Sequence, residues 1–460
     1  MNSLLGTIAL KTAIRSLLLI ALSASAFSQL TLPQFADCIS NSSSSYTTYT
    51  TYTVGGTNYS VPTCTLAAGT YGIYSSSEVS GWYATGNGTY SSYGQTLVVS
   101  RNDILVNGSG TWPSDLPILQ RGDGNYAPYS IMQVTGTGNL IEDLTIDGNR
   151  TLNTTLDCND SVHWVDIEAG SGSNTGVQDV VLENSPDIAL DLGPGSSNSV
   201  SECGVPNYGC AYLYQTEFLY NRGFGVYATA NEFIDFNTFE FTGANAIYVS
   251  ATSDVTVEYN GLYQNHDEFP FSAPGGQLVV NSGASGTGIH DNYINGYNAT
   301  CSSADCLPIT TTFGTGGGAS CSVDLGDNSS FMPQGIEHYG DSSILTNNEI
   351  TQNSGGFNGN GMTNLTINGE VNDGWSQYYI EDNVIGIYIY YTSEFGGNYG
   401  TFTFNNIQSK NNSTYGVDWT DTVGTATLGW AGGGSCLTGN TNGPYTGVPS
   451  YPSSTTAPCY

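Results

Sequence analysis

The sequence predicts an all-β protein that folds as a single-stranded right-handed parallel β-helix, a solenoid of short strands with inserted loops. Three observations support this fold class: a repeated unit of short alternating strands, polar turns rich in Gly and Asn, and a near absence of helical periodicity. Clear copies of the unit are GVYATANEFIDFNTFEFTGA (225–244) and NAIYVSATSDVTVEYNGLYQN (245–265). One coil cannot bury its own apolar face, whereas coils stacked about 4.8 Å apart share a continuous core. A sandwich or a propeller would instead need hairpin turns and more regular repeat lengths.

The corners of the expected coils carry Gly and Asn, which accept left-handed backbone angles more readily than other residues. An Asn-x-apolar step recurs at equivalent points of the repeat. Stacked Asn side chains can hydrogen-bond to one another along such a helix. We therefore expect an asparagine ladder at Asn237, Asn260, Asn292, Asn348, Asn383 and Asn406.

The unit GVYATANEFIDFNTFEF, together with the phrases LAAGTYGI and NLIEDLTIDGNR, resembles the pectate-lyase-like right-handed parallel β-helix superfamily. The resemblance covers roughly residues 60–430 and implies the fold. It does not imply one activity, because the superfamily contains polysaccharide lyases, glycoside hydrolases, epimerases, phage tailspikes and non-catalytic surface proteins.

The N-terminus has the pattern of a signal peptide. Lys11 and Arg15 precede the apolar run 17–22, and Ala24-Ser25-Ala26 is a small-x-small cleavage site. A buried N-terminal helix is the alternative interpretation. No later stretch is long and apolar enough to span a bilayer. The sequence therefore predicts a secreted protein that is extracellular or at the cell surface.

The ten cysteines agree with export, because disulfides persist in oxidising compartments. Their spacing suggests pairs Cys38–Cys64 and Cys436–Cys459, although spacing alone does not fix connectivity. We expect four parts: a signal peptide (1–26), a Ser/Thr/Tyr-rich entry segment that is a linker or irregular (27–62), the β-helix (63–430), and a Gly/Pro/Ser-rich C-terminal tail that a disulfide could staple (431–460).

The formal net charge of −32 arises from 39 acidic residues against 7 Lys and Arg. Nucleic acid is therefore not expected as a partner, because phosphate binding needs clustered basic residues. Anionic membranes and polyanionic sugars are disfavoured for the same reason. An extracellular neutral polysaccharide or glycan is the partner that the charge allows, and a homo-oligomer is compatible with the sequence.

Three carboxylates fall on one expected outer face. Strict alternation along each strand would point Asp166, Glu168 and Asp191 outward on two neighbouring coils, with Glu168 and Asp191 about 5 Å apart. Such a separation suits the paired carboxylates of glycoside hydrolysis. Crowding of like charges raises at least one pKa, which keeps a general acid protonated. These three residues are the predicted catalytic groups.

Aromatic residues continue the same face, and rings of this kind pack against the C–H faces of sugars. A second group of polar residues begins a loop that is expected to overhang a coil. The predicted substrate-binding residues are Trp164, His163, Tyr227, Tyr248, His266, Asp267 and Glu268.

Three alternatives to a catalytic site remain open. The three carboxylates could simply be exposed surface groups. A one-residue shift in register would exchange the inward and outward residues of each strand. The carboxylate oxygens could also bind calcium. No other metal or cofactor is expected. If the protein is an enzyme, a glycoside hydrolase is favoured over a lyase, because no basic cluster is present to neutralise a uronate and abstract its proton. The rival to an enzyme is a non-enzymatic surface protein such as an adhesin, a spike or a fibre subunit.

Overall fold

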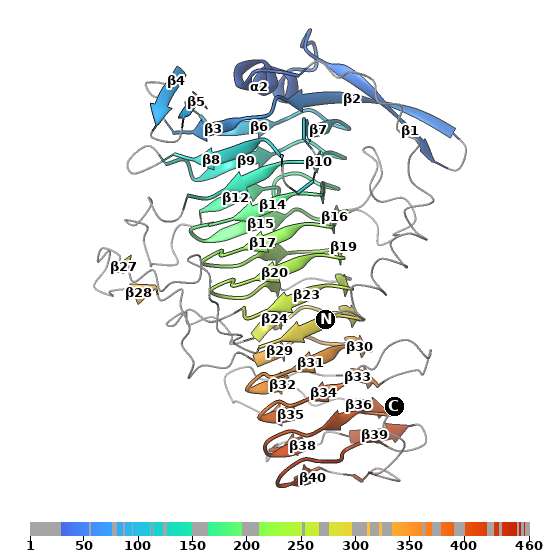
Figure 1. Ribbon diagram of the computed structural model, residues 1–460. Helices are drawn as coiled ribbons and strands as arrows, with labels where there is room; N and C mark the ends of the chain where they lie inside the picture. The colour runs from blue at the N-terminus through green and yellow to red at the C-terminus, as the bar shows by residue number, and fades with distance from the viewer. Residues whose placement is uncertain are drawn as a thin grey trace.

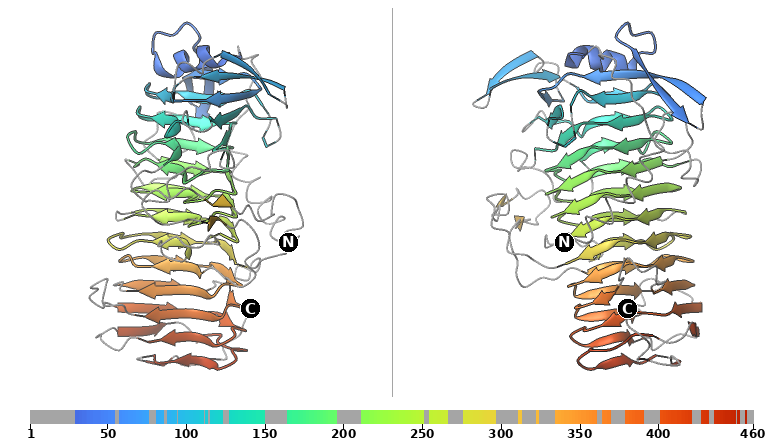
Figure 2. Two further views of the ribbon diagram at one scale, coloured as in Figure 1. Left: turned by 90° about the vertical axis from the view of Figure 1, so that its left-hand side faces the viewer. Right: turned by 45° about the vertical axis from the view of Figure 1, so that its right-hand side comes forward.

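The computed structural model describes residues 29–54, 57–75, 81–85, 88–93, 95–110, 112–113, 115–122, 127–149, 164–195, 211–250, 254–265, 276–296, 311–312, 322–323, 334–360, 364–369, 379–390, 401–420, 427–431, 435–448, 450–451 and 455. Within these residues the chain forms an elongated stack of coils (Figures 1 and 2). Successive strands pass from one sheet to the next, so three long sheets, here named A, B and C, run the length of the stack.

Sheet A contains, in spatial order, β1 (Thr48–Val54), β2 (Thr57–Leu66), β7 (Leu105–Gly108), β10 (Leu140–Glu142), β13 (Gly176–Gln178), β16 (Ala211–Tyr214), β19 (Glu232–Asp235), β22 (Thr256–Glu258), β25 (Gly288–His290), β30 (Ile344–Thr346), β33 (Leu365–Asn368), β36 (Thr401–Asn405) and β39 (Thr427–Ala431).

Sheet B contains β37 (Ser409–Lys410), β34 (Ile380–Glu381), β31 (Glu349–Thr351), β26 (Tyr293–Asn295), β23 (Gly261–Tyr263), β20 (Thr238–Glu240), β17 (Glu217–Leu219), β14 (Val181–Glu183), β11 (Thr145–Asp147), β8 (Ile118–Arg121), β3 (Thr70–Ile73), β5 (Gly88–Tyr93) and β4 (Gly81–Thr85).

Sheet C contains β40 (Gly443–Thr446), β38 (Tyr415–Trp419), β35 (Ile385–Tyr390), β32 (Gly355–Asn360), β29 (Gln334–His338), β24 (Gly276–Val280), β21 (Ile247–Val249), β18 (Val226–Ala228), β15 (Ile188–Leu192), β12 (Val165–Glu168), β9 (Ser130–Val134) and β6 (Leu97–Val99). A separate antiparallel pair joins β27 (Thr311–Thr312) to β28 (Ser322–Val323).

Neighbouring strands in the three long sheets are parallel, apart from the antiparallel pairs β1–β2 and β4–β5. The predicted all-β parallel β-helix is therefore confirmed. Its interior is a single apolar core that extends from Leu30 to Val448. The core is built of in-register stacks, such as Ile141 on Val177 and Val177 on Leu213 in sheet A. Each fully buried side chain of this kind contributes about 1.5–3 kcal/mol of transfer free energy.

The entry segment is not the irregular linker that its Ser/Thr/Tyr composition predicts. Residues 32–40 form the helix α2 (Leu32–Ser40), which buries Leu32, Phe35 and Ile39 over the first coil (Figure 1). The Gln34 side chain accepts a hydrogen bond from the Thr31 N–H at the start of this helix. The hairpin β1–β2 then joins the edge of sheet A. A run of alternating Thr and Tyr resembles a low-complexity linker in composition, but both residues also have a high propensity for β-strands.

The predicted disulfide Cys38–Cys64 is present and ties α2 to β2. Cys436 is disulfide-bonded, and its predicted partner Cys459 lies outside the described residues. The coils continue past residue 430, because β40 pairs with β38 in sheet C. The predicted signal peptide (1–26) lies outside the described residues and stays a prediction.

The asparagine ladder forms where the chain turns from sheet A into sheet B. Asn237 Nδ2 donates to Asn260 Oδ1, Asn260 Nδ2 to Asn292 Oδ1, and Asn292 Nδ2 to Asn348 Oδ1, at 3.0, 3.0 and 2.9 Å. Asn383 does not join this ladder. It belongs to a second one before sheet C, where Asn353 Nδ2 donates to its Oδ1 at 3.4 Å. The Asn-x-apolar step occurs both before sheet B and before sheet C. It therefore does not show at which of these two corners a given Asn lies.

Candidate functional site

A groove of about 590 Å³ lies on the outer face of sheet C, across β9, β12, β15 and β18. It is lined by Tyr129, Ser130, Val165, Glu168, Ile188, Asp191, Phe224 and Tyr227. Its volume falls within the range of small-molecule sites in proteins, about 300–1,000 Å³.

The groove exists because strict alternation fails in these strands. Ser130 faces outward, the next two residues, Ile131 and Met132, enter the core, and Gln133 contacts Glu168 on the outer face. The following coils repeat this arrangement, with outward residues three positions apart. Two inward residues in succession leave only backbone between the outward side chains. The outward residues form two columns along the helix axis, one with Ser130, Val165 and Ile188 and the other with Glu168, Asp191 and Tyr227. These columns are the walls of the groove, and the backbone between them is its shallow floor.

Glu168 and Asp191 are cross-strand partners in the β12–β15 register, as the sequence predicts. Paired positions on neighbouring parallel strands are about 4.8 Å apart. Glu168 Oε2 accepts hydrogen bonds from Ser130 Oγ at 2.7 Å and Gln133 Nε2 at 3.3 Å. Gly170 leaves room for the second carboxylate, since a Cβ there would lie 2.5 Å from Asp191 Oδ2.

The prediction that Asp166 shares this face is wrong. Asp166 is one of the two inward residues of β12, and its exposed fraction is 0%. Its Oδ1 accepts a hydrogen bond from Arg121 Nη2 at 2.6 Å, in an ion pair whose two side chains are both fully buried. Burial raises the pKa of Asp166 to about 6, although the guanidinium beside it favours the charged form. The side chain is therefore an internal anchor rather than a group that meets substrate.

Arg121 connects sheet B to the strands that carry the groove. Its guanidinium donates to the carbonyl oxygens of Pro128, Tyr129 and Val165 as well as to Asp166. Its charged carbon also lies 5.6 Å from the centre of the Trp164 ring. Trp164 packs on the 62% exposed Tyr129, with ring centroids 4.9 Å apart. One buried cation thus fixes the backbone beneath two aromatic residues at the edge of the groove.

Tyr227 and Tyr248, which the sequence predicts as an aromatic platform, are neighbours on sheet C. Tyr227 is the cross-strand partner of Asp191, Tyr248 is the partner of Tyr227, and their rings stack at 5.4 Å. Phe224 packs on Tyr248 at 4.9 Å. Burial raises the pKa of the Tyr248 hydroxyl, which therefore stays protonated and able to donate a hydrogen bond at neutral pH.

A further carboxyl group, that of Glu232, lies at the start of β19 in sheet A and interacts with Asp191. Its side chain is fully buried, and Oε1 accepts hydrogen bonds from Thr229 N, Thr229 Oγ1 and Ala230 N. Desolvation raises the pKa of Glu232 to about 8, and the nearby Asp191 charge adds a smaller contribution in the same direction. Asp191 therefore interacts with two other carboxyl groups, that of its cross-strand partner Glu168 and that of Glu232.

Several predicted residues cannot be placed. His163, His266, Asp267 and Glu268 lie outside the described residues. Sequence reasoning also missed contributors to the site: Tyr129, Ser130, Gln133 and Phe224. The three-residue spacing that Ser130–Gln133 and Phe224–Tyr227 share was the signal that could have revealed them.

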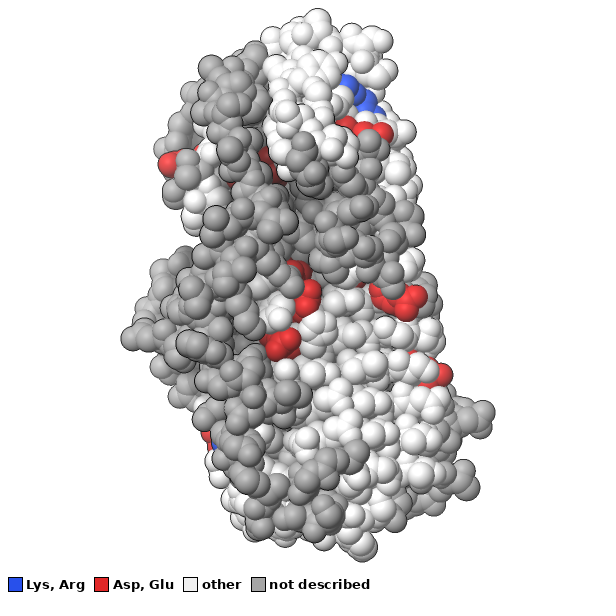
Figure 3. All heavy atoms as spheres, turned by 90° about the vertical axis from the view of Figure 1, so that its right-hand side faces the viewer, with Lys and Arg blue, Asp and Glu red and all other residues white. Residues whose placement is uncertain are grey.

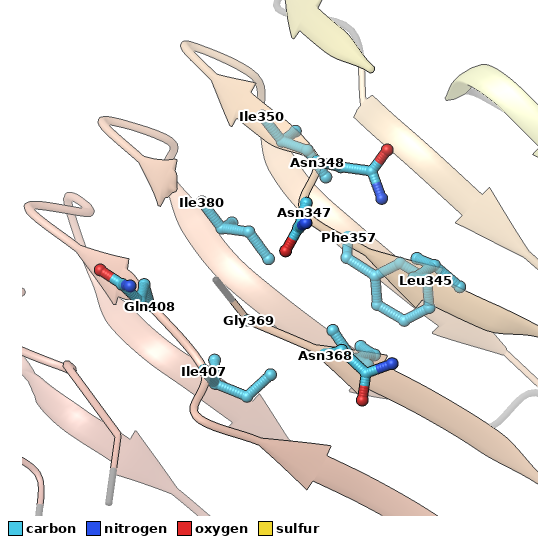
Figure 4. A pocket seen from close by; sticks show the side chains of 11 residues that line it. Leu345, Asn347, Asn348, Ile350, Phe357, Asn368, Gly369, Ile380, Ile407 and Gln408 are labelled. Carbon is cyan, nitrogen blue, oxygen red and sulfur yellow. The ribbon is translucent and has the colours of Figure 1, made fainter. Parts of the chain in front are cut away.

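Other features of the described residues do not form a comparable site. A cavity of about 20 Å³ lies inside the lower coils between Leu345, Phe357, Ile380 and their neighbours (Figure 4), and it has room for about one water molecule. No group of three or more His, Cys, Asp and Glu side chains in the described part of the chain is arranged to hold a metal ion. No described helix is long and apolar enough to cross a membrane.

Comparison with known proteins gives structural neighbours only. No family model matches the chain, and no curated protein matches it. Among solved structures, the A-module of a mannuronan C-5 epimerase from Azotobacter vinelandii aligns with TM-score 0.42 and 15% identity, over 84% of this chain and 88% of that one.

The catalytic domain of a GH87 α-1,3-glucanase, solved with nigerose, aligns with TM-score 0.41 and 12% identity, over 83% of this chain and 61% of that one. A periplasmic alginate epimerase aligns with TM-score 0.36 and 8% identity, over 84% and 85% of the two chains. At such low identities and TM-scores the likeness concerns the parallel β-helix fold, and the function must be argued from the groove itself.

Proposed function

We propose that the groove on sheet C binds a neutral polysaccharide and hydrolyses its glycosidic bonds, with Glu168 and Asp191 as the catalytic pair. The observation that carries the proposal is the in-register pairing of these two carboxylates between the walls of an open groove. Merely exposed acids would not be expected to coincide with a concave surface and an aromatic platform.

The pairing suits a retaining reaction, in which the two carboxyl groups lie about 5–5.5 Å apart. Ser130 and Gln133 donate hydrogen bonds to Glu168 and hold its carboxylate in a fixed position in the groove. Glu168 is therefore the nucleophile, which attacks the anomeric carbon and forms a glycosyl ester. Asp191, the cross-strand partner of Glu168, is the acid that protonates the departing glycosidic oxygen. It then removes a proton from the water that hydrolyses the ester.

The lining also limits the substrate. Phe224, Tyr227 and Tyr248 present rings to one side of the carboxylates, and Tyr129 and Trp164 lie on the other. Rings bind the apolar faces of sugar units. The formal net charge of −32 disfavours an anionic polymer. The Cys38–Cys64 disulfide supports secretion, where such a polymer would be met.

The test is a reducing-sugar assay of the full-length protein on a panel of neutral polysaccharides. We expect Glu168→Gln and Asp191→Asn each to lower the rate at least about 100-fold. Glu183→Gln, which changes a carboxylate on sheet B, is the matched control and should leave the rate unchanged. Hydrolysis that survives both groove substitutions would disprove this site. If the wild-type protein releases no reducing sugar from any polymer, the non-enzymatic surface protein is favoured instead.

A further inference from the structure

A second row of aromatic residues lies on the opposite side of the fold, where the strands of sheet A end. Phe236 directly follows β19 and Tyr259 directly follows β22. Their rings stack with centroids 4.9 Å apart and an interplanar angle of 17°. Tyr214 contacts Phe236 edge-on at 5.7 Å, and His290 contacts Tyr259 edge-on at 6.3 Å. The row follows the helix axis over four coils.

Phe236 and Tyr259 occupy strained backbone positions. Their φ angles are +60° and +55°, in the left-handed region. This conformation costs most side chains about 1–2 kcal/mol, and Asn and Asp tolerate it best. The same corner in other coils carries small or flexible polar residues, namely Asp143, Asp179, Gln215, Asp291 and Asn347. Folding alone would favour such residues in all coils, so Phe236 and Tyr259 are present at a cost in stability.

Polar side chains beside the rings can bind hydroxyl groups. His290 Nδ1 lies 3.3 Å from Glu258 Oε2 and 3.3 Å from Asp291 Oδ2. The His290 side chain is 32% exposed, and the Asp291 side chain is 15% exposed. Figure 3 views the molecule from the side where Figure 1 labels the strands of sheet A, and acidic side chains gather there at mid-height on a surface with little other charge.

We propose that the Phe236–Tyr259 pair, with Glu258, His290 and Asp291, is a second, non-catalytic binding site for a neutral polysaccharide chain. The choice of polymer rests on the proposed function of the groove. The half-buried rings of Phe236 and Tyr259 stack on each other, and their exposed parts form a continuous apolar strip along the axis. Carboxylates and imidazole beside them accept and donate hydrogen bonds to hydroxyl groups. The site lies on sheet A and the groove on sheet C, so both can hold polymer at once.

Charge excludes an anionic ligand here. The described basic side chains are engaged elsewhere: Arg101 bonds the Cys38 carbonyl oxygen, Arg121 and Arg222 are buried, and Lys410 pairs with Glu381 on sheet B. An anionic polymer would therefore find no Lys or Arg side chain among the described residues of this site, and Glu258 and Asp291 would repel it. A neutral chain meets no such repulsion, and it can contact both the exposed parts of the rings and the polar side chains beside them.

The decisive variant is the double substitution Phe236→Asn with Tyr259→Asn. Asn accepts the left-handed conformation, so we expect a melting temperature equal to or above that of the parent protein. Binding to insoluble neutral polymers (cellulose, chitin, and α- and β-glucans) should weaken at least about tenfold, because each ring lost in a stacking site costs on the order of 1 kcal/mol. Pull-down isotherms in the Glu168→Gln background measure this without degradation of the polymer.

A matched control is available at another corner of the fold. Tyr220 and Phe241 also have φ +55° each, and their rings stack at 5.3 Å. Tyr220→Asn with Phe241→Asn should relieve the same strain and leave polymer binding unchanged.

The outcomes separate this proposal from that for the groove. Unchanged binding by the Phe236/Tyr259 variant, or a clear loss of its stability, would overturn the second site. Absence of binding by the parent protein to every polymer would do so too. If the wild-type protein binds a polymer through these rings but hydrolyses none, the second site stands and the catalytic proposal falls.

Discussion

Gly170 is the residue on which the position of the Asp191 carboxylate depends. A Cβ at this position would lie 2.5 Å from Asp191 Oδ2, closer than any real contact. Gly170→Ala should therefore turn the carboxylate out of line with Glu168. We expect hydrolysis to fall by more than about tenfold while the melting temperature changes little, because residue 170 is exposed.

The control is Gly429→Ala, whose added Cβ would meet only the Phe402 carbonyl oxygen at an ordinary 3.7 Å. Full activity in Gly170→Ala would show that the position of Asp191 does not matter for turnover.

The buried Arg121–Asp166 pair makes a stability prediction. Removal of one partner leaves the other as an uncompensated internal charge, which costs about 3–5 kcal/mol. Arg121→Met should lower the urea midpoint accordingly. The double variant Arg121→Met with Asp166→Leu should recover part of the loss, although the carbonyl groups of Tyr129 and Val165 lose the hydrogen bonds that Arg121 donates. A single variant as stable as the parent would contradict the role of Arg121 as an anchor.

At the scale of the strand, repetition made the fold and the register predictable. Each coil repeats the pattern of its neighbours, and this repetition fixes how the strands align. The sequence therefore predicts the alignment of Glu168, Asp191 and Tyr227 correctly. Asp166 was not, because strict alternation was assumed where β12 has two inward residues in succession. No sequence pattern indicates that Arg121, 45 residues earlier, reaches Asp166 inside the stack.

The asparagine ladder gives a prediction at the same scale. Asn260 Nδ2 donates to Ile234 O and Asn292 Oδ1, while its Oδ1 accepts from Asn237. Asn260→Ala would leave several buried polar groups unsatisfied, at about 1–3 kcal/mol for each group fully lost.

Thermal unfolding should show a clearly lower melting temperature for Asn260→Ala than for Asn405→Ala. The Asn405 side chain lies half-buried on the outer face of sheet A. Equal losses in the two variants would mean that the ladder adds nothing beyond an ordinary surface contact.

For the molecule as a whole, crowded carboxyl groups predict an unusual pH dependence. Desolvation, aided by like charges nearby, raises the pKa of Glu142 and Glu232 to about 8 and that of Asp143, Glu183 and Glu349 to about 7. Between about pH 4 and 8 the folded protein therefore binds more protons than the unfolded chain. Its stability must fall as the pH rises through this range.

We expect the melting temperature to be highest near pH 4–5 and to decline by several degrees by pH 8. Glu142→Gln should flatten part of that decline, since it removes one of the groups concerned. A melting temperature that is constant or rises over this range would contradict the raised pKa values.

In each groove strand of sheet C, two successive residues face inward and the residues on either side of them face outward. This pattern determines how the groove could change in evolution. Every coil adds one residue to each wall of the groove. The number of coils, rather than the length of the loops, therefore determines how long the groove is. Duplication of a coil between β15 and β18 would lengthen the groove by one unit and move the aromatic platform outward, while the register of both carboxylates would be preserved. If the groove has the proposed function, its specificity for chain length would follow the number of coils and could change without a change at Glu168 and Asp191.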